Sequence, residues 1–136
     1  MKCKILVILS YQNNSYISNQ MPKKTTIINK KSEEFLEKYL NNASPTGFES
    51  EGQRIWLNYI NPYIDETIID TYGTAVGVIN PNAKYKVVIE AHADEISWFV
   101  HYITNEGFIY LRRNGGSDHQ IAPSKRVNIH TKKGMI

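Results

Sequence analysis

The apolar positions of the chain follow a helical period first and a strand period afterwards. Four apolar residues between 35 and 40 fall on one face of a helix, which Ser32 can cap at its N-terminus. A second helix is predicted to begin directly after Ser50, because Ser50 and Gln53 have the spacing of a capping box. Pro62 is expected to end it, since proline cannot continue a helix.

Alternating or β-branched runs in the rest of the chain predict strands separated by turns. The run over 86–91, which contains Val87, Val88 and Ile89, has the composition of a strand buried in a parallel sheet. Two helices followed by such strands suit an α/β sheet domain. The predicted strands cover residues 67–70, 75–79, 86–91, 98–103, 108–111 and 126–130, with the fourth and fifth joined as a hairpin.

A histidine and a carboxylate follow the strand predicted over 86–91. His92 comes directly after it, and Asp94 stands two residues later. In open α/β sheets, ligands bind beyond the carboxyl ends of the strands. A neutral imidazole is the commonest metal ligand in proteins, and a nearby carboxylate can orient it. From this pattern alone, a buried histidine beside a solvated acidic turn is the more frequent explanation.

The net charge of +3 arises in the N-terminal part of the chain. Residues 1–32 contain six lysines and no acidic residue, which leaves ten basic and thirteen acidic residues in 33–136. Lysines without interleaved aromatic residues give little support for nucleic-acid binding. We therefore expect a disordered basic extension over residues 1–31 and no nucleic-acid partner.

No targeting or membrane segment is expected in this sequence. The apolar run over 5–9 is shorter than the apolar core of a signal peptide, and nothing approaches the length of a membrane span. Met21 is a plausible start, so we expect residues 1–20 to be an upstream extension. Cys3 is the single cysteine, which excludes an intramolecular disulfide and fits a reducing compartment.

Six short motifs follow one another at characteristic spacings. They are 44–49 (Ser-Pro-Thr-Gly-Phe-Glu), 70–74 (Asp-Thr-Tyr-Gly-Thr), 92–96 (His-Ala-Asp-Glu-Ile), Gly107-Phe108, Gly115-Gly116 and Arg126-Val127. Their order over residues 33–136 resembles the M42 family of metallo-aminopeptidases, some of which have also carried the label endoglucanase. Thr74 stands where the family usually has Asn, and Ser97 where Gly is common.

The resemblance implies an α/β fold in two parts. Residues 32–96 would be the N-terminal part of the peptidase α/β sheet domain. Residues 97–136 would begin an inserted small β-barrel domain that serves in subunit assembly, with Trp98, Phe99 and Tyr102 in its core. It also implies a cytoplasmic protein that forms a homo-oligomer through this inserted domain.

The resemblance further implies a metal-dependent aminopeptidase that removes N-terminal residues from peptides with two divalent ions, zinc or cobalt. His92 would be a metal ligand, and Asp94 would belong to the catalytic site as the group that orients His92. The family's remaining ligands and its general base lie downstream of the matched segment. A catalytic zinc site needs about three protein ligands, so we expect this chain alone to be inactive.

Two other functional classes remain open. One is a non-catalytic assembly or binding module derived from a truncated paralogue. The other is a glycoside hydrolase, which requires two carboxylates at a fixed separation; the spacing of the available carboxylates selects no pair. His101, His119 and His130 are expected to have no metal role, and Gly115-Gly116 is expected to form a tight turn. The carboxylates available to a glycosidase are Glu49, Glu90, Asp94 and Glu95.

Overall fold

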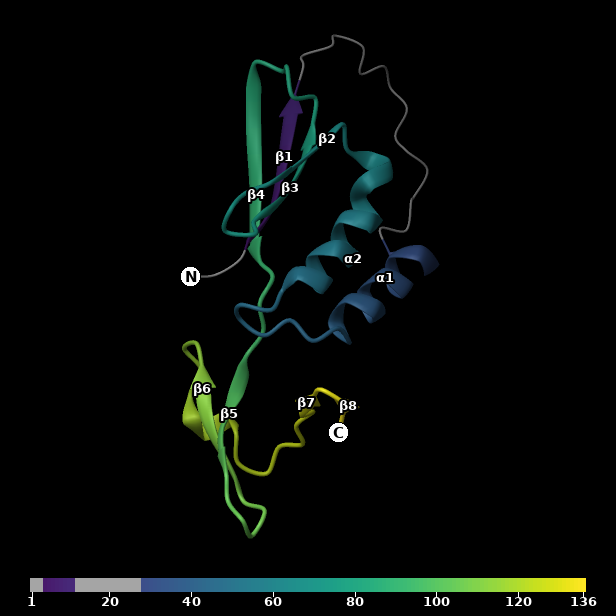
Figure 1. Cartoon of the computed structure of the whole chain (residues 1–136). Coiled ribbons are helices and arrows are strands. Elements are labelled where there is room, and N and C mark those ends of the chain that lie inside the picture. The colour runs from purple at the N-terminus through teal and green to yellow at the C-terminus, as the bar shows by residue number, and fades with distance from the viewer. Residues whose placement is uncertain (1–3, 12–27) are drawn as a thin grey trace. The chain divides into compact units, whose positions relative to one another are not determined.

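The computed structural model describes the backbone of residues 4–11 and all of residues 28–136 (Figure 1). The chain divides into two compact units, Met1–Glu95 and Ile96–Ile136. The predicted boundary lies one residue later, after Ile96.

The first unit contains two helices and a mixed sheet. Four described strands form the sheet in the order β2-β3-β1-β4. β1 pairs in parallel with β3 and antiparallel with β4, and β2 pairs antiparallel with β3. This mixture of helix and sheet agrees with the expected α/β class. The elements are β1 (Lys4–Tyr11), α1 (Lys30–Leu40), α2 (Ser50–Ile60), the short 3-10 helix η1 (Asn61–Tyr63), β2 (Glu66–Ile69), β3 (Ala75–Ile79) and β4 (Tyr85–His92).

β1 corrects the prediction that residues 1–31 form a disordered extension. Residues 4–11 form a strand between β3 and β4, and α1 already begins at Lys30. The apolar run over 5–9 is rich in Ile and Val, which favour strands, so it can pair although it is too short for a signal peptide. Residues 1–3 and 12–27, which include the proposed start at Met21, lie outside the described residues.

The start of α1 differs from the prediction by a few residues. Asn29, not Ser32, is the N-cap: its Oδ1 accepts a hydrogen bond from the Ser32 backbone N–H at 3.0 Å. The Ser32 hydroxyl oxygen accepts in return from the Asn29 N–H at 2.8 Å. The two residues thus form a reciprocal capping box in which Ser32 is the third helical residue.

The capping box predicted for α2 is absent. Glu49 occupies the N-cap position without a side-chain capping bond, and Ser50 is the first helical residue. Gln53 donates its side-chain amide to the Gly73 carbonyl in the β2–β3 turn instead. This contact fixes the helix to the sheet, which explains why Gln53 is not available to its own helix start.

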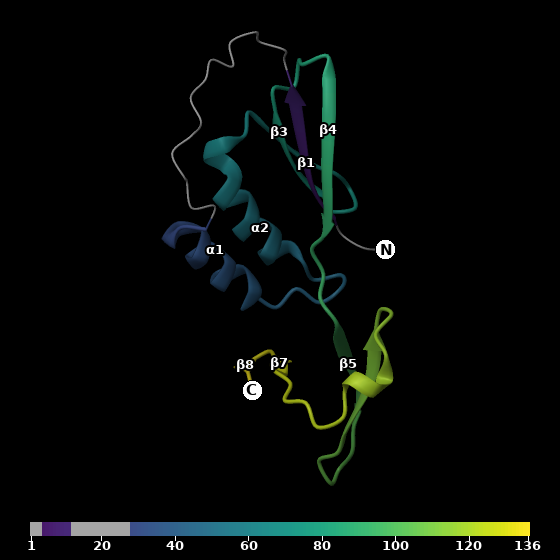
Figure 2. The ribbon, with the colours of Figure 1, turned by 180° about the vertical axis from the view of Figure 1, so that it is seen from behind.

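α2 covers one face of the sheet, and α1 packs on α2. α2 lies against β3, and both views in Figures 1 and 2 place α1 beside α2 on that same side. The Phe35 and Tyr59 rings stack between the two helices with centroids 4.0 Å apart. β3 supplies the buried surface beneath α2. Among residues 28–95, the buried apolar residues are Ile55, Ala75, Val76, Val78, Ala83 and Ala93.

β4 is not the buried parallel strand that its sequence predicted. Its described pairing is antiparallel, with β1, and all its side chains are exposed. Ile89, for example, retains 53% of its exposure. The apolar Val-Val-Ile run would suit a strand buried on both faces, but none of the described residues packs over β4 closely enough to bury it.

The second unit consists of two short antiparallel pairs. β5 and β6 form the predicted hairpin, with a β-bulge between Val100 and Tyr102. Phe99 and Tyr102, expected in a barrel core, are exposed, and the barrel itself stays a prediction. The elements are β5 (Ser97–Ile103), β6 (Ile109–Asn114), the 3-10 helix η2 (His119–Ile121), β7 (His130–Thr131) and β8 (Gly134–Met135).

The strand predicted over 126–130 is wrong except at its last residue. β7 begins only at His130 and pairs with β8 across a tight turn. Ile129 extends this ladder by exchanging backbone hydrogen bonds with Ile136. Gly115 has φ +81°, which confirms the predicted tight turn at that residue. None of the helices within the described residues is long and apolar enough to cross a membrane.

Candidate metal centre

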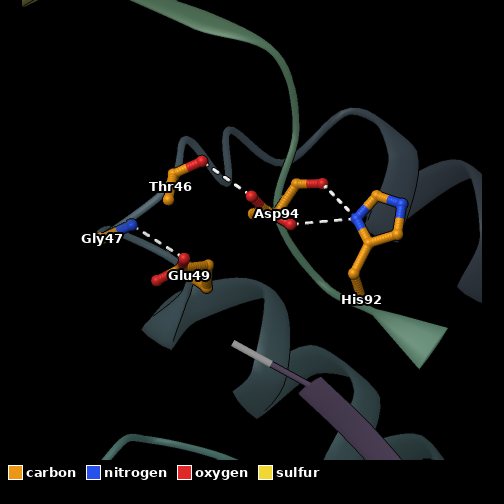
Figure 3. Close-up of polar contacts among 5 residues, drawn as sticks. All are labelled: Thr46, Gly47, Glu49, His92 and Asp94. Atoms are coloured by element: carbon orange, nitrogen blue, oxygen red, sulfur yellow. Dashed lines mark hydrogen bonds and ion pairs between the residues drawn. The ribbon is translucent and has the colours of Figure 1, made fainter. Parts of the chain in front are cut away.

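The candidate centre lies at the C-terminal end of β4, inside the first unit. His92 is the last residue of the strand, and Asp94 and Glu95 follow in the loop. The loop between α1 and α2, residues 41–49, lies beside this strand end, where Pro45 forms a parallel β-bridge with Glu95. Two motifs that are distant in the sequence therefore meet at one place (Figure 3).

The His92 ring is oriented entirely by Asp94. Its Nδ1 lies 2.9 Å from Asp94 Oδ1 and 2.9 Å from the Asp94 carbonyl oxygen. Both partners can only accept, so Nδ1 must be the protonated nitrogen of the neutral ring. Nε2 then carries a free lone pair. The side chain is 65% exposed, so this lone pair is accessible to a ligand from solution.

Asp94 is the buried member of the pair. Its side chain retains only 8% of its exposure, and its Oδ2 accepts a hydrogen bond of 2.7 Å from the Thr46 hydroxyl. Burial raises the pKa of Asp94, but the hydrogen bonds from Thr46 and His92, the charge interaction with His92 and a backbone hydrogen bond oppose it, and the pKa lies below the ordinary value. Asp94 is therefore a carboxylate at neutral pH.

Glu95 attaches the strand end to the α1–α2 loop. Its backbone N–H donates to the Ser44 carbonyl at 2.8 Å, and its Oε1 accepts from the Ser44 N–H at 2.7 Å. Further along this loop, the buried Glu49 carboxylate accepts from the Gly47 N–H at 2.7 Å. The sequence indicated Glu49 and Glu95 only as available carboxylates and indicated no role for Ser44 or Thr46. The motif at 44–49, which contains Ser44, Thr46 and Glu49, was the one signal that pointed to this loop.

The donor chemistry fits one ligand of a metal centre. A neutral imidazole with Nδ1 held by a carboxylate is the usual arrangement of a zinc-bound histidine. Among the described residues, however, no group of three or more His, Cys, Asp or Glu side chains could hold a metal ion. His101, His119 and His130 are exposed on the second unit. The described part of the chain thus offers His92 as a candidate donor without a complete set of three ligands.

The chain is similar to aminopeptidases in three comparisons. Residues 73–136 match the family model of the M42 glutamyl aminopeptidases. The putative aminopeptidase FrvX of Escherichia coli K12 is 30% identical over 102 residues, which are 75% of this chain and 28% of that protein. A putative aminopeptidase of Acetivibrio thermocellus is 29% identical over 103 residues, 76% of this chain and 30% of its own length.

A solved structure extends the likeness to the fold. The TET aminopeptidase from the marine sediment archaeon Thaumarchaeota archaeon SCGC AB-539-E09 superposes with a TM-score of 0.68 at 29% identity. The superposition covers 78% of this chain and 30% of that one. The chain thus spans less than a third of the length of the relatives it matches.

The α/β unit and these relatives make the chain similar to peptidases, a group of hydrolases. Within that class, residues 73–136 match the M42 aminopeptidase family, and the relatives extend the likeness over about three quarters of the chain.

Proposed function

We propose that the protein acts as a metal-dependent aminopeptidase that removes N-terminal residues from peptides, and that His92 binds one of two divalent ions, zinc or cobalt. The observation that carries the proposal is the state of the imidazole. Asp94 holds Nδ1–H, so the exposed Nε2 is left with its lone pair toward solution. The match of residues 73–136 to the M42 family model supports the reaction class.

Each residue of the pair has one task. His92 contributes a neutral nitrogen donor, and Asp94 fixes the plane of the ring and increases its basicity through the Nδ1–H bond. When bound, the metal pair would supply a water of lowered pKa and polarise the scissile carbonyl. A catalytic zinc site needs about three protein ligands, and the described residues bring no such group of three together. We therefore expect no peptidase activity from this chain alone.

The assembly and location of the protein are further parts of the proposal. The exposed apolar side chains of the β5–β6 hairpin, Phe99 and Tyr102 among them, fit a homo-oligomer formed through the second unit as the start of an inserted β-barrel. A cytoplasmic location is compatible with a chain whose single cysteine cannot form an internal disulfide.

A Zn²⁺ titration followed by NMR of the four histidine rings tests the ligand assignment. We expect the Nε2 signal of His92 to respond at a Zn²⁺ concentration about tenfold lower than the signals of His101, His119 and His130, which serve as controls within the same chain. His92→Ala should remove the early response and leave the other three unchanged. Equal responses of all four rings would contradict the assignment.

Chelator-sensitive hydrolysis of aminoacyl-nitroanilides separates the peptidase from the two alternatives. In a protein that carries the remaining family segments, we expect this activity, and His92→Ala should reduce the bound metal from two ions to one per subunit. An assembly module would show no hydrolysis of any substrate. A glycosidase is disfavoured because the Asp94 and Glu95 carboxylates are engaged by Thr46, His92 and Ser44. Hydrolysis of a glycoside but not of the nitroanilide would reverse that conclusion.

A further inference from the structure

Each oxygen of the Asp94 carboxylate has its own partner. Oδ1 accepts from His92 Nδ1 at 2.9 Å, and Oδ2 accepts from the Thr46 hydroxyl at 2.7 Å (Figure 3). A hydroxyl-to-carboxylate bond of this length is charge-assisted and stronger than a neutral one. The donors come from different elements, because Thr46 belongs to the α1–α2 loop and His92 ends β4.

The contact with Thr46 determines the rotation of the carboxylate. The terminal torsion of an aspartate is broad, so a carboxylate held at one oxygen can turn away from its partner. A second donor on the opposite oxygen removes that freedom. Thr46 thereby acts on the imidazole through Asp94, the group that holds the ring.

We propose that Thr46 is a positioning residue for the His92–Asp94 pair: its hydroxyl holds Asp94 so that Oδ1 keeps the proton on His92 Nδ1 and leaves Nε2 unprotonated. This inference rests on the proposed function, since Nε2 is the nitrogen assigned to the metal. It goes beyond that function by assigning a task to the α1–α2 loop.

Thr46 is itself held in place by the residues around it. The two hydrogen bonds between Ser44 and Glu95 and the bridge at Pro45 attach the loop to the strand end, immediately before Thr46. Gly52 permits this arrangement, because a Cβ on Gly52 would lie 2.5 Å from the Ser44 hydroxyl oxygen. The loop can therefore present the Thr46 hydroxyl at a fixed place.

The first test measures the ring without metal. In the full chain labelled with ¹⁵N-histidine, at a pH above the titration range of imidazole, we expect Thr46→Val to increase the exchange rate of the His92 Nδ1–H with water by about fivefold or more. Thr46→Ser retains a hydroxyl and is the matched control, with an exchange rate near that of the wild type. Unchanged exchange in Thr46→Val, with the remaining amide signals at wild-type positions, would overturn the proposal.

The second test asks whether Thr46 acts through Asp94. Thr46→Val should weaken Zn²⁺ binding at His92 by roughly tenfold, the lower end of the range for groups that orient metal ligands. In an Asp94→Ala background the same substitution should cause no further loss, because the carboxylate it controls is gone. An equal loss in both backgrounds would mean that Thr46 merely stabilises the loop, and the proposal would fail.

The two tests separate this proposal from the proposed function. If Zn²⁺ shows no preference for His92 in the wild type while Thr46→Val still accelerates Nδ1–H exchange, the metal assignment fails and the positioning role stands. If Zn²⁺ selects His92 and Thr46→Val alters neither the exchange nor the affinity, the metal assignment stands and the positioning role fails.

Discussion

At the scale of single residues, two aspartates of this protein act by accepting hydrogen bonds from backbone or ring N–H groups. Asp94 illustrates this at the candidate centre, and Asp70 does so in the β2–β3 turn. In both, hydrogen bonds to the carboxylate keep it charged. The consequence can be measured at Asp70, which is far from any proposed ligand in the sequence.

Asp70→Asn should change how stability depends on pH. The backbone N–H of Thr74 is the largest cause that lowers the pKa of Asp70, and that of Tyr72 adds to it. A lowered folded-state pKa stabilises the fold above the unfolded value, and this contribution is lost as pH falls through the folded value. At pH 7 we expect the free energy of unfolding of the wild type to exceed that of Asp70→Asn. This difference should shrink as the pH falls below about 4.

Urea unfolding at pH 7 and pH 3 measures this difference. Glu66→Gln, which removes an acidic charge from the neighbouring strand β2, is a control for the general loss of negative charge. A stability difference between wild type and Asp70→Asn that is the same at both pH values would contradict the expectation.

At the scale of elements, the site depends on the close approach of α2 to the sheet. Gly77 in β3 makes this approach possible, because a Cβ at that position would lie 2.7 Å from Ile60 Cδ1 and 3.1 Å from Ile64 Cγ2. Gly52 plays the corresponding part at the other end of the helix, against Ser44. The two glycines thus set the spacing of the helix from the strand and from the α1–α2 loop.

Gly77→Ala is therefore predicted to destabilise the first unit by about 1–3 kcal/mol, the usual cost of overpacking. The added methyl group must displace Ile60 and Ile64 or move the helix. Chemical denaturation monitored by the helix signal in circular dichroism measures the effect. Gly116→Ala is the control, since nothing lies within 4 Å of a Cβ there. A Gly77→Ala variant as stable as the control would mean that the helix has room to adjust.

At the scale of the whole molecule, β4 presents an exposed apolar strand. It lies at the end of the described strand order, and Val88 retains 53% of its exposure. An unpaired strand edge with apolar side chains is a template for pairing with another chain. We expect the chain to associate increasingly as its concentration rises.

Val88→Lys should reduce this association, because a lysine on an edge strand opposes pairing with a second edge. Sedimentation velocity over a range of protein concentrations measures it as a lower average mass than that of the wild type. Asn82→Lys adds the same charge in the exposed turn before β4 and should leave the association unchanged. Equal association of the two variants would exclude β4 as its origin.

The sequence predicted an element well where neighbouring residues determine its structure. It predicted less well where the structure depends on residues distant in the sequence. The bounds of β3 and the presence of the β5–β6 hairpin followed from alternation and turn residues, although β6 ends three residues later than predicted. The place of β1 and the exposure of β4 did not, because strand neighbours are chosen by contacts across the chain. At the site, His92 and Asp94 were found from their spacing. Thr46 belongs to the motif at 44–49, but it is 48 positions from Asp94, so nothing in the sequence connected the two side chains.

The attachment of Glu95 to Ser44 has a consequence for the order of folding. These residues are 51 positions apart, so their two hydrogen bonds close a long ring of chain. Closing such a ring costs entropy that is recovered only after the intervening helix and strands have docked. The imidazole of His92 would then acquire its fixed tautomer late in folding. A partly folded chain leaving the ribosome would lack an oriented nitrogen donor that could bind a metal ion prematurely.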